Sequence, residues 1–156
     1  MASFEQAVAF VLSHEGGWAN VSGDPGGLTR YGLSSTAYPD IDFGTLTLDE
    51  AKAIYEKDYW TPIRGLEIAD QGVANKVLDM AVNMGVGTAV RILQGAVGAV
   101  VDGVVGPLTI GRTNAHDPAL LLLELRAQSA VRYAQIAISN PGAQKFLVGW
   151  LRRAVS

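Results

Sequence analysis

The stretch SHEGGWANVSGDPGGLTRYG, residues 13–32, interrupts an otherwise helical pattern and decides how the first half of this 156-residue chain is interpreted. It holds six glycines, one proline and only two acidic residues, Glu15 and Asp24. The residues before it have helical spacing, so Glu15 stands where that helix should end. The negative end of the helix dipole disfavours a carboxylate there. We therefore expect a raised pKa for Glu15, which would let it donate a proton near neutral pH.

Two acids in a glycine-rich loop have a limited chemical repertoire. The spacing of a calcium-binding EF-hand is missing. A glycoside hydrolase, by contrast, needs one protonated carboxylic acid and a second group that is negatively charged or holds water. Gly16 and Gly17 would let a sugar approach the backbone closely. The alternative is that Glu15 is a solvated residue at a frayed helix end and Asp24 belongs to an ordinary Asp-Pro-Gly turn. His14 could tune the glutamate, or it could be simply a packed or solvated residue.

Helical periodicity and capping signals surround this loop on both sides. Capping boxes at Ser3 with Gln6 and at Thr47 with Glu50 each open a helix, and Pro107 suits the first position of a later one. The predicted helices cover residues 4 to about 15, 48–60, 68–84, 88–97, a short helix from 107, 118–138, and a final one from Pro141 to about 153. Gly85 and Gly87 separate the third from the fourth.

The sequence therefore predicts an all-α, lysozyme-like fold with room for a small β-hairpin within 28–46. We expect one domain over 1–156, because no linker rich in proline, serine or charge divides it. The long irregular segment 16–46 is of a kind that is more often functional than accidental.

Composition excludes several classes of function. The chain has no cysteine, so disulfides, thiolate zinc sites and cysteine nucleophiles are excluded. Residues 1–102 carry six basic and thirteen acidic residues, a net charge of −7. Residues 103–156 carry six basic and two acidic residues, a net charge of +4. The basic residues are too few to favour nucleic acid. Arg152 and Arg153 could form part of a basic face or complement the end of the last helix.

The quoted stretch resembles the signature of glycoside hydrolase family 108, a lysozyme-type muramidase family found mainly in phages, prophages and bacteria. The matching residues are Glu15, Gly16, Gly17, Trp18, Asp24, Gly26, Gly27, Thr29, Arg30, Tyr31 and Gly32. The family usually has tyrosine at the position of Trp18. The resemblance continues in DYWTPIRG and DMAVNMGVGTAVRILQ, and VDGVVGPLTI is similar to the peptidoglycan-associated part commonly paired with the family.

The resemblance implies hydrolysis of the β-1,4 bond between N-acetylmuramic acid and N-acetylglucosamine, the reaction of a lysozyme. Glu15 would be the general acid. Asp24 would hold the attacking water or stabilise the oxocarbenium charge, and Thr29 would orient that water. Residues 1–85 would form the catalytic half and residues 86–156 the helical, peptidoglycan-associated half.

Aromatic and amide side chains could bind the sugar. Trp18 and Tyr31 are candidates for stacking on a pyranose, whereas core packing is the alternative for Trp60. Asn83 could bond an acetamido group or satisfy backbone near its helix end. Asp79, four residues earlier on the same face, could simply pair with a lysine.

The resemblance also implies a biological setting. We expect a monomeric phage or prophage endolysin whose partner is the glycan strand of peptidoglycan, without a cofactor, a metal, nucleic acid or stable membrane insertion. It would be made in the host cytoplasm and reach the periplasmic wall after holin-dependent release. Two alternatives remain open: a lytic transglycosylase that uses the same glutamate, and a peptidoglycan-binding module without activity.

Overall fold

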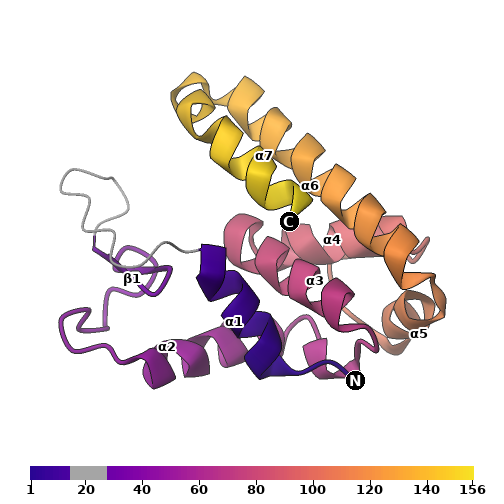
Figure 1. Ribbon diagram of the computed structural model, residues 1–156, viewed down its shortest axis with the longest axis horizontal. Coiled ribbons are helices and arrows are strands. Elements are labelled where there is room, and N and C mark those ends of the chain that lie inside the picture. The colour runs from indigo at the N-terminus through magenta and orange to yellow at the C-terminus, as the bar shows by residue number, and fades with distance from the viewer. Residues whose placement is uncertain (15–27) are drawn as a thin grey trace.

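The computed structural model describes residues 1–14 and 28–156, and helices dominate both parts (Figure 1). The α-helices of the described residues are α1 (Phe4–His14), α2 (Leu48–Tyr55), α3 (Gln71–Met84), α4 (Val86–Ala96), α5 (Pro107–Ala115), α6 (Pro118–Ser139) and α7 (Leu147–Val155). Shorter elements are a π-helical turn at Glu56–Trp60, 3₁₀ turns at Gly65–Glu67 and Pro141–Phe146, and the strands β1 (Thr29–Arg30) and β2 (Leu33–Ser34). The all-α prediction and the small hairpin are confirmed.

The two predicted capping boxes differ in outcome. At Thr47 both halves form, because Thr47 Oγ1 accepts from the Glu50 N–H and the Glu50 carboxylate accepts from the Thr47 N–H at 2.7 Å. At Ser3 only the hydroxyl half is present. The Ser3 N–H instead donates to Gln71 Oε1 of α3 at 2.7 Å. A residue distant in sequence thus takes the place expected for Gln6.

Several predicted helix boundaries are wrong by a few residues. The third helix begins at Gln71 rather than 68, because Asp70 is its N-cap and accepts from the Val73 N–H. The fourth begins at Val86, since Gly85 with φ 85° is already the break and Gly87 lies inside the helix. The final helix begins at Leu147, preceded by the 3₁₀ turn over Pro141–Phe146.

The hairpin pairs Thr29 with Ser34 and Arg30 with Leu33, and its two-residue turn is Tyr31–Gly32. Both turn residues have positive φ, 51° at Tyr31 and 77° at Gly32, which matches a type I′ turn. A tyrosine in the left-handed region is strained. The Tyr55 hydroxyl of α2 donates to the Tyr31 carbonyl at 2.9 Å and ties the turn to the helical body.

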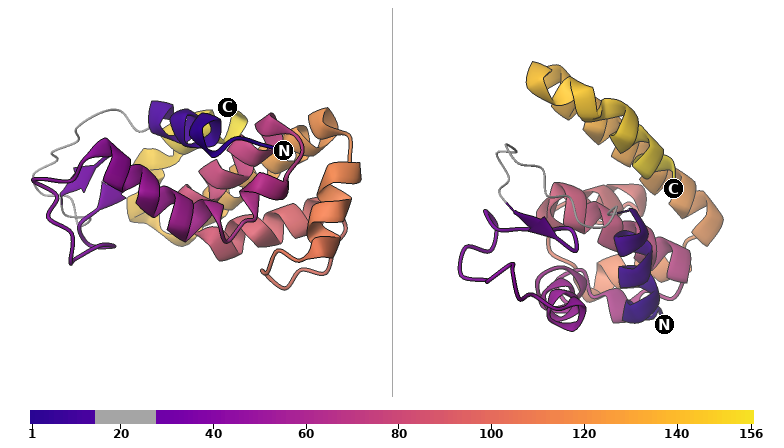
Figure 2. Two further views of the ribbon diagram at one scale, coloured as in Figure 1. Left: turned by 90° about the horizontal axis from the view of Figure 1, so that it is seen from below. Right: turned by 60° about the vertical axis from the view of Figure 1, so that its left-hand side comes forward.

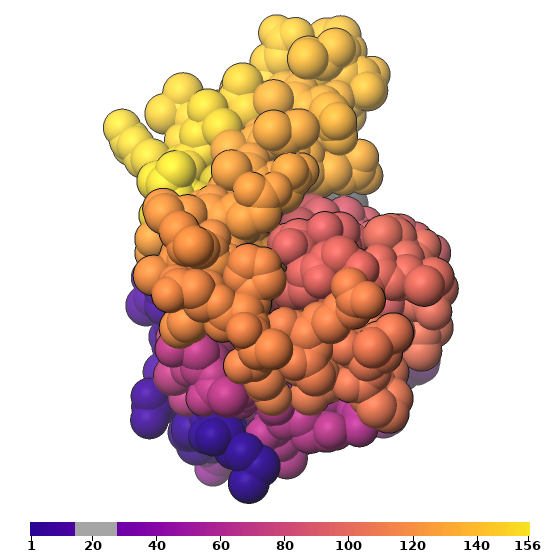
Figure 3. All heavy atoms as spheres, turned by 90° about the vertical axis from the view of Figure 1, so that its right-hand side faces the viewer, coloured from indigo at the N-terminus to yellow at the C-terminus, as the bar shows by residue number. Residues whose placement is uncertain are grey.

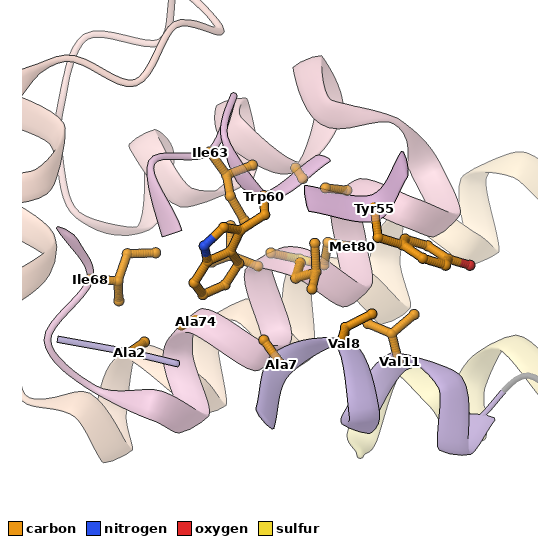
Figure 4. Packing of buried hydrophobic residues seen from close by; sticks show 14 of the residues in the cluster. Ala2, Ala7, Val8, Val11, Tyr55, Trp60, Ile63, Ile68, Ala74 and Met80 are labelled. Carbon is orange, nitrogen blue, oxygen red and sulfur yellow. The ribbon is translucent and has the colours of Figure 1, made fainter. Parts of the chain in front are cut away.

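The core lies where α1, α2, the π-helical turn and α3 meet (Figure 4). Val8 and Val11 of α1 face the same cluster as Tyr55 and Met80, and Trp60 fills its centre with 1% of its surface exposed. The predicted core alternative for Trp60 is confirmed. The buried cluster extends through α4 to Leu121 and Leu125 of α6, so the core continues into the C-terminal part of the chain.

Helices α6 and α7 form an antiparallel pair that projects beyond the rest of the molecule (Figure 2). Asp117 caps the start of α6 by accepting from the Leu120 N–H at 2.9 Å, and Pro118 occupies its first position, as predicted. Tyr133 of α6 stacks on Trp150 of α7 with ring centroids 5.4 Å apart. No helix in the described part of the chain is both long and apolar enough to cross a membrane.

Candidate active site

The last turn of α1 is closed by its own side chains. His14 Nδ1 lies 2.9 Å from the Phe10 carbonyl oxygen, and the Ser13 hydroxyl donates to the same oxygen at 2.6 Å. The His14 ring also packs edge-on against Phe10, with centroids 4.7 Å apart. His14, which directly precedes Glu15, therefore makes two contacts with Phe10 of its own helix, which agrees with the packed alternative for His14.

A cavity of about 360 Å³ opens beside His14. Its lining joins three elements that are distant in sequence: His14 at the end of α1, Asn83 near the end of α3, and Gly149, Trp150, Arg152 and Arg153 of α7. Among the predicted sugar-binding residues, Asn83 lies in this cavity. The α7 residues were not predicted to line it, and their only sequence signal was an arginine pair near a tryptophan.

Arg153 lies in the last turn of α7, and its side chain reaches across to α3. Its Nε donates to Asp79 Oδ1 at 2.7 Å, and Asp79 is 1% exposed. Lys76 is buried on the other side of this carboxylate, with Nζ 3.5 Å from Asp79 Oδ2 and 2.9 Å from the Arg153 carbonyl oxygen. The predicted pairing of Asp79 with a lysine is confirmed. Arg153 lies in the last turn of α7, as the helix-end interpretation predicted, and its side chain in addition pairs with the buried Asp79 carboxylate.

Burial and charge act in opposite directions on Lys76. Removal of the ammonium group from water lowers the pKa of Lys76, and the neighbouring Asp79 carboxylate raises it by less. Asp79 therefore offsets part of the cost of burying the charged form of Lys76. The same carboxylate fixes α7 against α3 at the wall of the cavity.

Asn83 is exposed and uses its amide group locally. Its Nδ2 donates to the Asp79 carbonyl oxygen at 2.8 Å, four residues back along α3. The structure thus contains the backbone contact that was the alternative to sugar binding, and it also places Asn83 at the cavity. The two roles are compatible, since the backbone contact uses the amide nitrogen and orients the side chain.

Thr29 and Tyr31 lie elsewhere in the described structure, in β1 and in its turn. Neither lines the cavity beside His14. Tyr31 is half-buried against the core, and the Arg30 guanidinium lies 5.3 Å from its ring centroid. Arg30 also donates to the Phe43 and Gly44 carbonyls, which attaches the hairpin to the segment before α2.

Glu15, Trp18 and Asp24 lie outside the described residues. Within residues 1–14 and 28–156, no group of three or more histidine, aspartate or glutamate side chains is arranged to hold a metal ion.

Comparison with known proteins accounts for nearly the whole chain. Residues 8–85 match the family model described as Glycosyl hydrolase 108, and residues 88–155 match one described as Predicted Peptidoglycan domain. The chain belongs to the glycosyl hydrolase 108 family. The family resemblance of the loop motif is confirmed. As a family 108 member with a peptidoglycan domain, the protein is a glycoside hydrolase that acts on peptidoglycan.

The solved structure of SagA from Brucella abortus is similar to this family 108 protein along most of both chains. The two are 28% identical, and the match covers 97% of this chain and 93% of the other with a TM-score of 0.72. Comparison with curated proteins gave no match. The likeness to SagA spans both matched segments, so the arrangement of the helical body and the C-terminal helices is shared.

Proposed function

We propose that this protein is a lysozyme that hydrolyses the β-1,4 bond between N-acetylmuramic acid and N-acetylglucosamine, with Glu15 as general acid. Asp24 holds the attacking water or stabilises the positive charge on the sugar, and Thr29 orients that water. The observation that carries the proposal is the cavity lined by His14, the residue before Glu15, within a segment that matches a glycoside hydrolase family.

The surroundings of that cavity are suited to a sugar. Trp150 offers an aromatic surface, Asn83 offers an amide oxygen for an N–H group, and Arg152 offers a charged donor. Trp18 and Tyr31 extend sugar binding into the loop motif under this proposal. A general acid placed beside such a surface is typically worth about 10²–10⁴ in rate.

Glu15→Gln tests the catalytic assignment directly, because glutamine keeps the shape of the side chain and cannot supply the proton. Glu5→Gln is the matched control. It removes a carboxylate from the other end of the same helix, where Glu5 pairs with Lys52 on the surface at 2.6 Å. We expect clearance of purified peptidoglycan to fall by at least about 100-fold in Glu15→Gln and to stay unchanged in Glu5→Gln. Equal clearance by both variants would show that Glu15 is not the acid.

Mass spectrometry of the digest separates the proposal from its rivals. A hydrolase adds water to each cleaved bond, whereas a lytic transglycosylase leaves an anhydromuramic end that is lighter by one water. A binding module leaves the strands uncut. The anomer released at the start of the reaction further distinguishes inversion from retention.

We further infer that the protein acts as an endolysin, made in the host cytoplasm and released through a holin lesion to the periplasmic wall as a monomer. The family resemblance supports this setting. Expression in a bacterium should leave the culture intact until the inner membrane is permeabilised, and lysis should then be rapid for the parent and absent for Glu15→Gln. Lysis without permeabilisation would contradict a holin-dependent route.

A further inference from the structure

A second, larger cavity lies far along the chain from the loop motif. It has a volume of about 480 Å³ and runs between α4 and α6, on which its lining residues are Thr88, Arg91, Ile92, Gly95, Ala96, Glu124, Gln128, Val131, Arg132 and Gln135. It shares no lining residue with the cavity beside His14. We call it the α4–α6 groove. Figure 3 views the molecule from the side on which α6 rises past the preceding helices into the projecting C-terminal pair.

The sequence motif VDGVVG holds one cation of this groove in place. Gly103 has a φ of 85°, a conformation that favours glycine, and a Cβ there would lie 2.8 Å from Arg91 Cζ, so a larger residue would displace the guanidinium. Arg91 donates to the Gly87 and Asp102 carbonyl oxygens at 3.2 and 3.4 Å. Buried Gln94 fixes the turn by binding the Asp102 carboxylate at 2.7 Å. The turn therefore holds the Asp102 carboxylate on Gln94 and on the Val104 N–H, from where its charge still acts on Arg91.

The second cation, Arg132 of α6, has an unmet hydrogen-bond donor. Its Nε is buried and has no hydrogen-bond partner in the described structure. Among the described residues, neither Arg91 nor Arg132 forms an ion pair with a carboxylate within 4.0 Å. A buried donor left unsatisfied costs free energy, so the Arg132 side chain gains from a shift that brings its Nε to an acceptor.

The groove carries a net positive charge with amides around it. Among the described residues, Glu124 is the only acid that lines the groove, and its carboxylate accepts from the Gln128 amide at 2.8 Å. Gln135 adds a further amide. Two lining arginines against one lining glutamate leave one positive charge on the groove wall, and Asp102, which lies outside the lining, offsets part of the charge of Arg91. Planar guanidinium groups pair with carboxylates through two parallel hydrogen bonds.

We propose that the α4–α6 groove binds the stem peptide of peptidoglycan through its free carboxylates, with Arg132 and Arg91 as the recognising groups. The inference rests on peptidoglycan being the substrate and adds a peptide-reading site to the glycan-cleaving one. Stem peptides are short chains with several free carboxylates, and they project from the glycan strand that the enzyme cuts. Contact with them would hold the enzyme on the wall between cleavage events.

Titration of the full chain with the free stem tripeptide, which contains no sugar, tests the groove separately from catalysis. We expect amide NMR shifts on α4 and α6, and an affinity about tenfold weaker in Arg132→Gln, because one charge-assisted contact is lost. Lys145→Gln is the matched control, since it removes the same charge from the 3₁₀ turn outside the groove. Its affinity should equal that of the parent.

The tripeptide with its carboxylates converted to carboxamides keeps the test valid even if Arg132→Gln fails to fold. The parent should bind it at least about tenfold more weakly than the free acid. Equal affinity for acid and carboxamide, equal affinity in Arg132→Gln and parent, or shifts confined to other helices would each overturn the proposal. Cleavage of glycan strands stripped of their peptides tests the lysozyme assignment without any peptide contact, so failure of that assignment would be seen there and not in the tripeptide titration.

Discussion

Replacement of Asp79 by asparagine perturbs the one buried carboxylate that joins α3 to α7. The substitution keeps the volume of the side chain and removes its charge. Among the described residues, Lys76 then keeps only the Arg153 carbonyl oxygen as a hydrogen-bond partner. A lysine that is 2% exposed would have to retain a charge without its counterion or give up its proton.

The expected cost follows from this burial. Removal of one partner from a buried ion pair typically costs about 3–5 kcal/mol. In a chain of this size each kcal/mol lowers the unfolding midpoint by about 2–4 °C, so Asp79→Asn should melt roughly 10 °C below the parent. The same substitution loosens α7 at the cavity wall. Peptidoglycan cleavage should therefore fall at temperatures where the variant is still folded.

The pH dependence of the variant gives a second measure of the same effect. The folded state holds the pKa of Lys76 below its ordinary value of 10.5. The unfolded chain therefore binds more protons between the two pKa values, and stability rises with pH in that interval. Without Asp79 the folded pKa should fall further, so the stability deficit of Asp79→Asn should shrink as the pH rises from neutral toward 10.5.

Urea unfolding of four proteins completes the test: the parent, Asp79→Asn, Lys76→Met and the double variant. Because Lys76→Met removes the buried cation, Asp79→Asn should cost less in that background than in the parent. A cost below about 1 kcal/mol in the parent background, or the same cost in both backgrounds, would refute the reasoning. Either result would mean that Lys76 does not depend on this carboxylate.

Two further predictions concern local structure. Gly65→Ala should destabilise the fold severely in urea unfolding, because the new Cβ would lie 2.3 Å from ring carbons of Trp60. Gly111→Ala is its control within helix α5. Its new Cβ would meet no atom within 4 Å, so the substitution should stabilise the fold by about 0.5–1 kcal/mol. Hydrogen bonds from Thr47 lower the pKa of Glu50 below its ordinary 4.5. The stability advantage of the parent over Glu50→Gln should therefore be present above pH 4.5 and disappear as the pH falls through the lowered pKa, in paired melting curves.

Local chemistry made much of the helical fold predictable from sequence. The Thr47 capping box, Asp117 before Pro118, and Pro107 at a first helical position each specify a helix start from adjacent residues alone. For the hairpin, the sequence predicted only that it could lie within residues 28–46, and neither its strands nor its turn. Its turn places a tyrosine at positive φ, which propensity disfavours, and a hydrogen bond from Tyr55 compensates.

Contacts between distant residues were not predictable in this way. The Ser3 N–H bonds to Gln71 and not to Gln6, to which the local pattern assigned it, and Arg153 in the last turn of α7 crosses to Asp79. In the two cases the partner lies 68 and 74 residues away in the sequence. Nothing in the periodicity of a single helix encodes such a contact.

The contact between α7 and α3 also bears on how the two matched segments cooperate. The glycosyl hydrolase match ends at residue 85 and the peptidoglycan match begins at residue 88, yet the cavity beside His14 is lined from both. Asp79 of the first segment holds Arg153 of the second at 2.7 Å, so the wall that α7 contributes is positioned by a buried charge of the first segment. If the cavity holds the glycan, residues 88–155 cannot act only as a tether to the wall. Exchange of α7 for the helix of another family member should then alter cleavage of stripped glycan strands, which a detached binding module would leave unchanged.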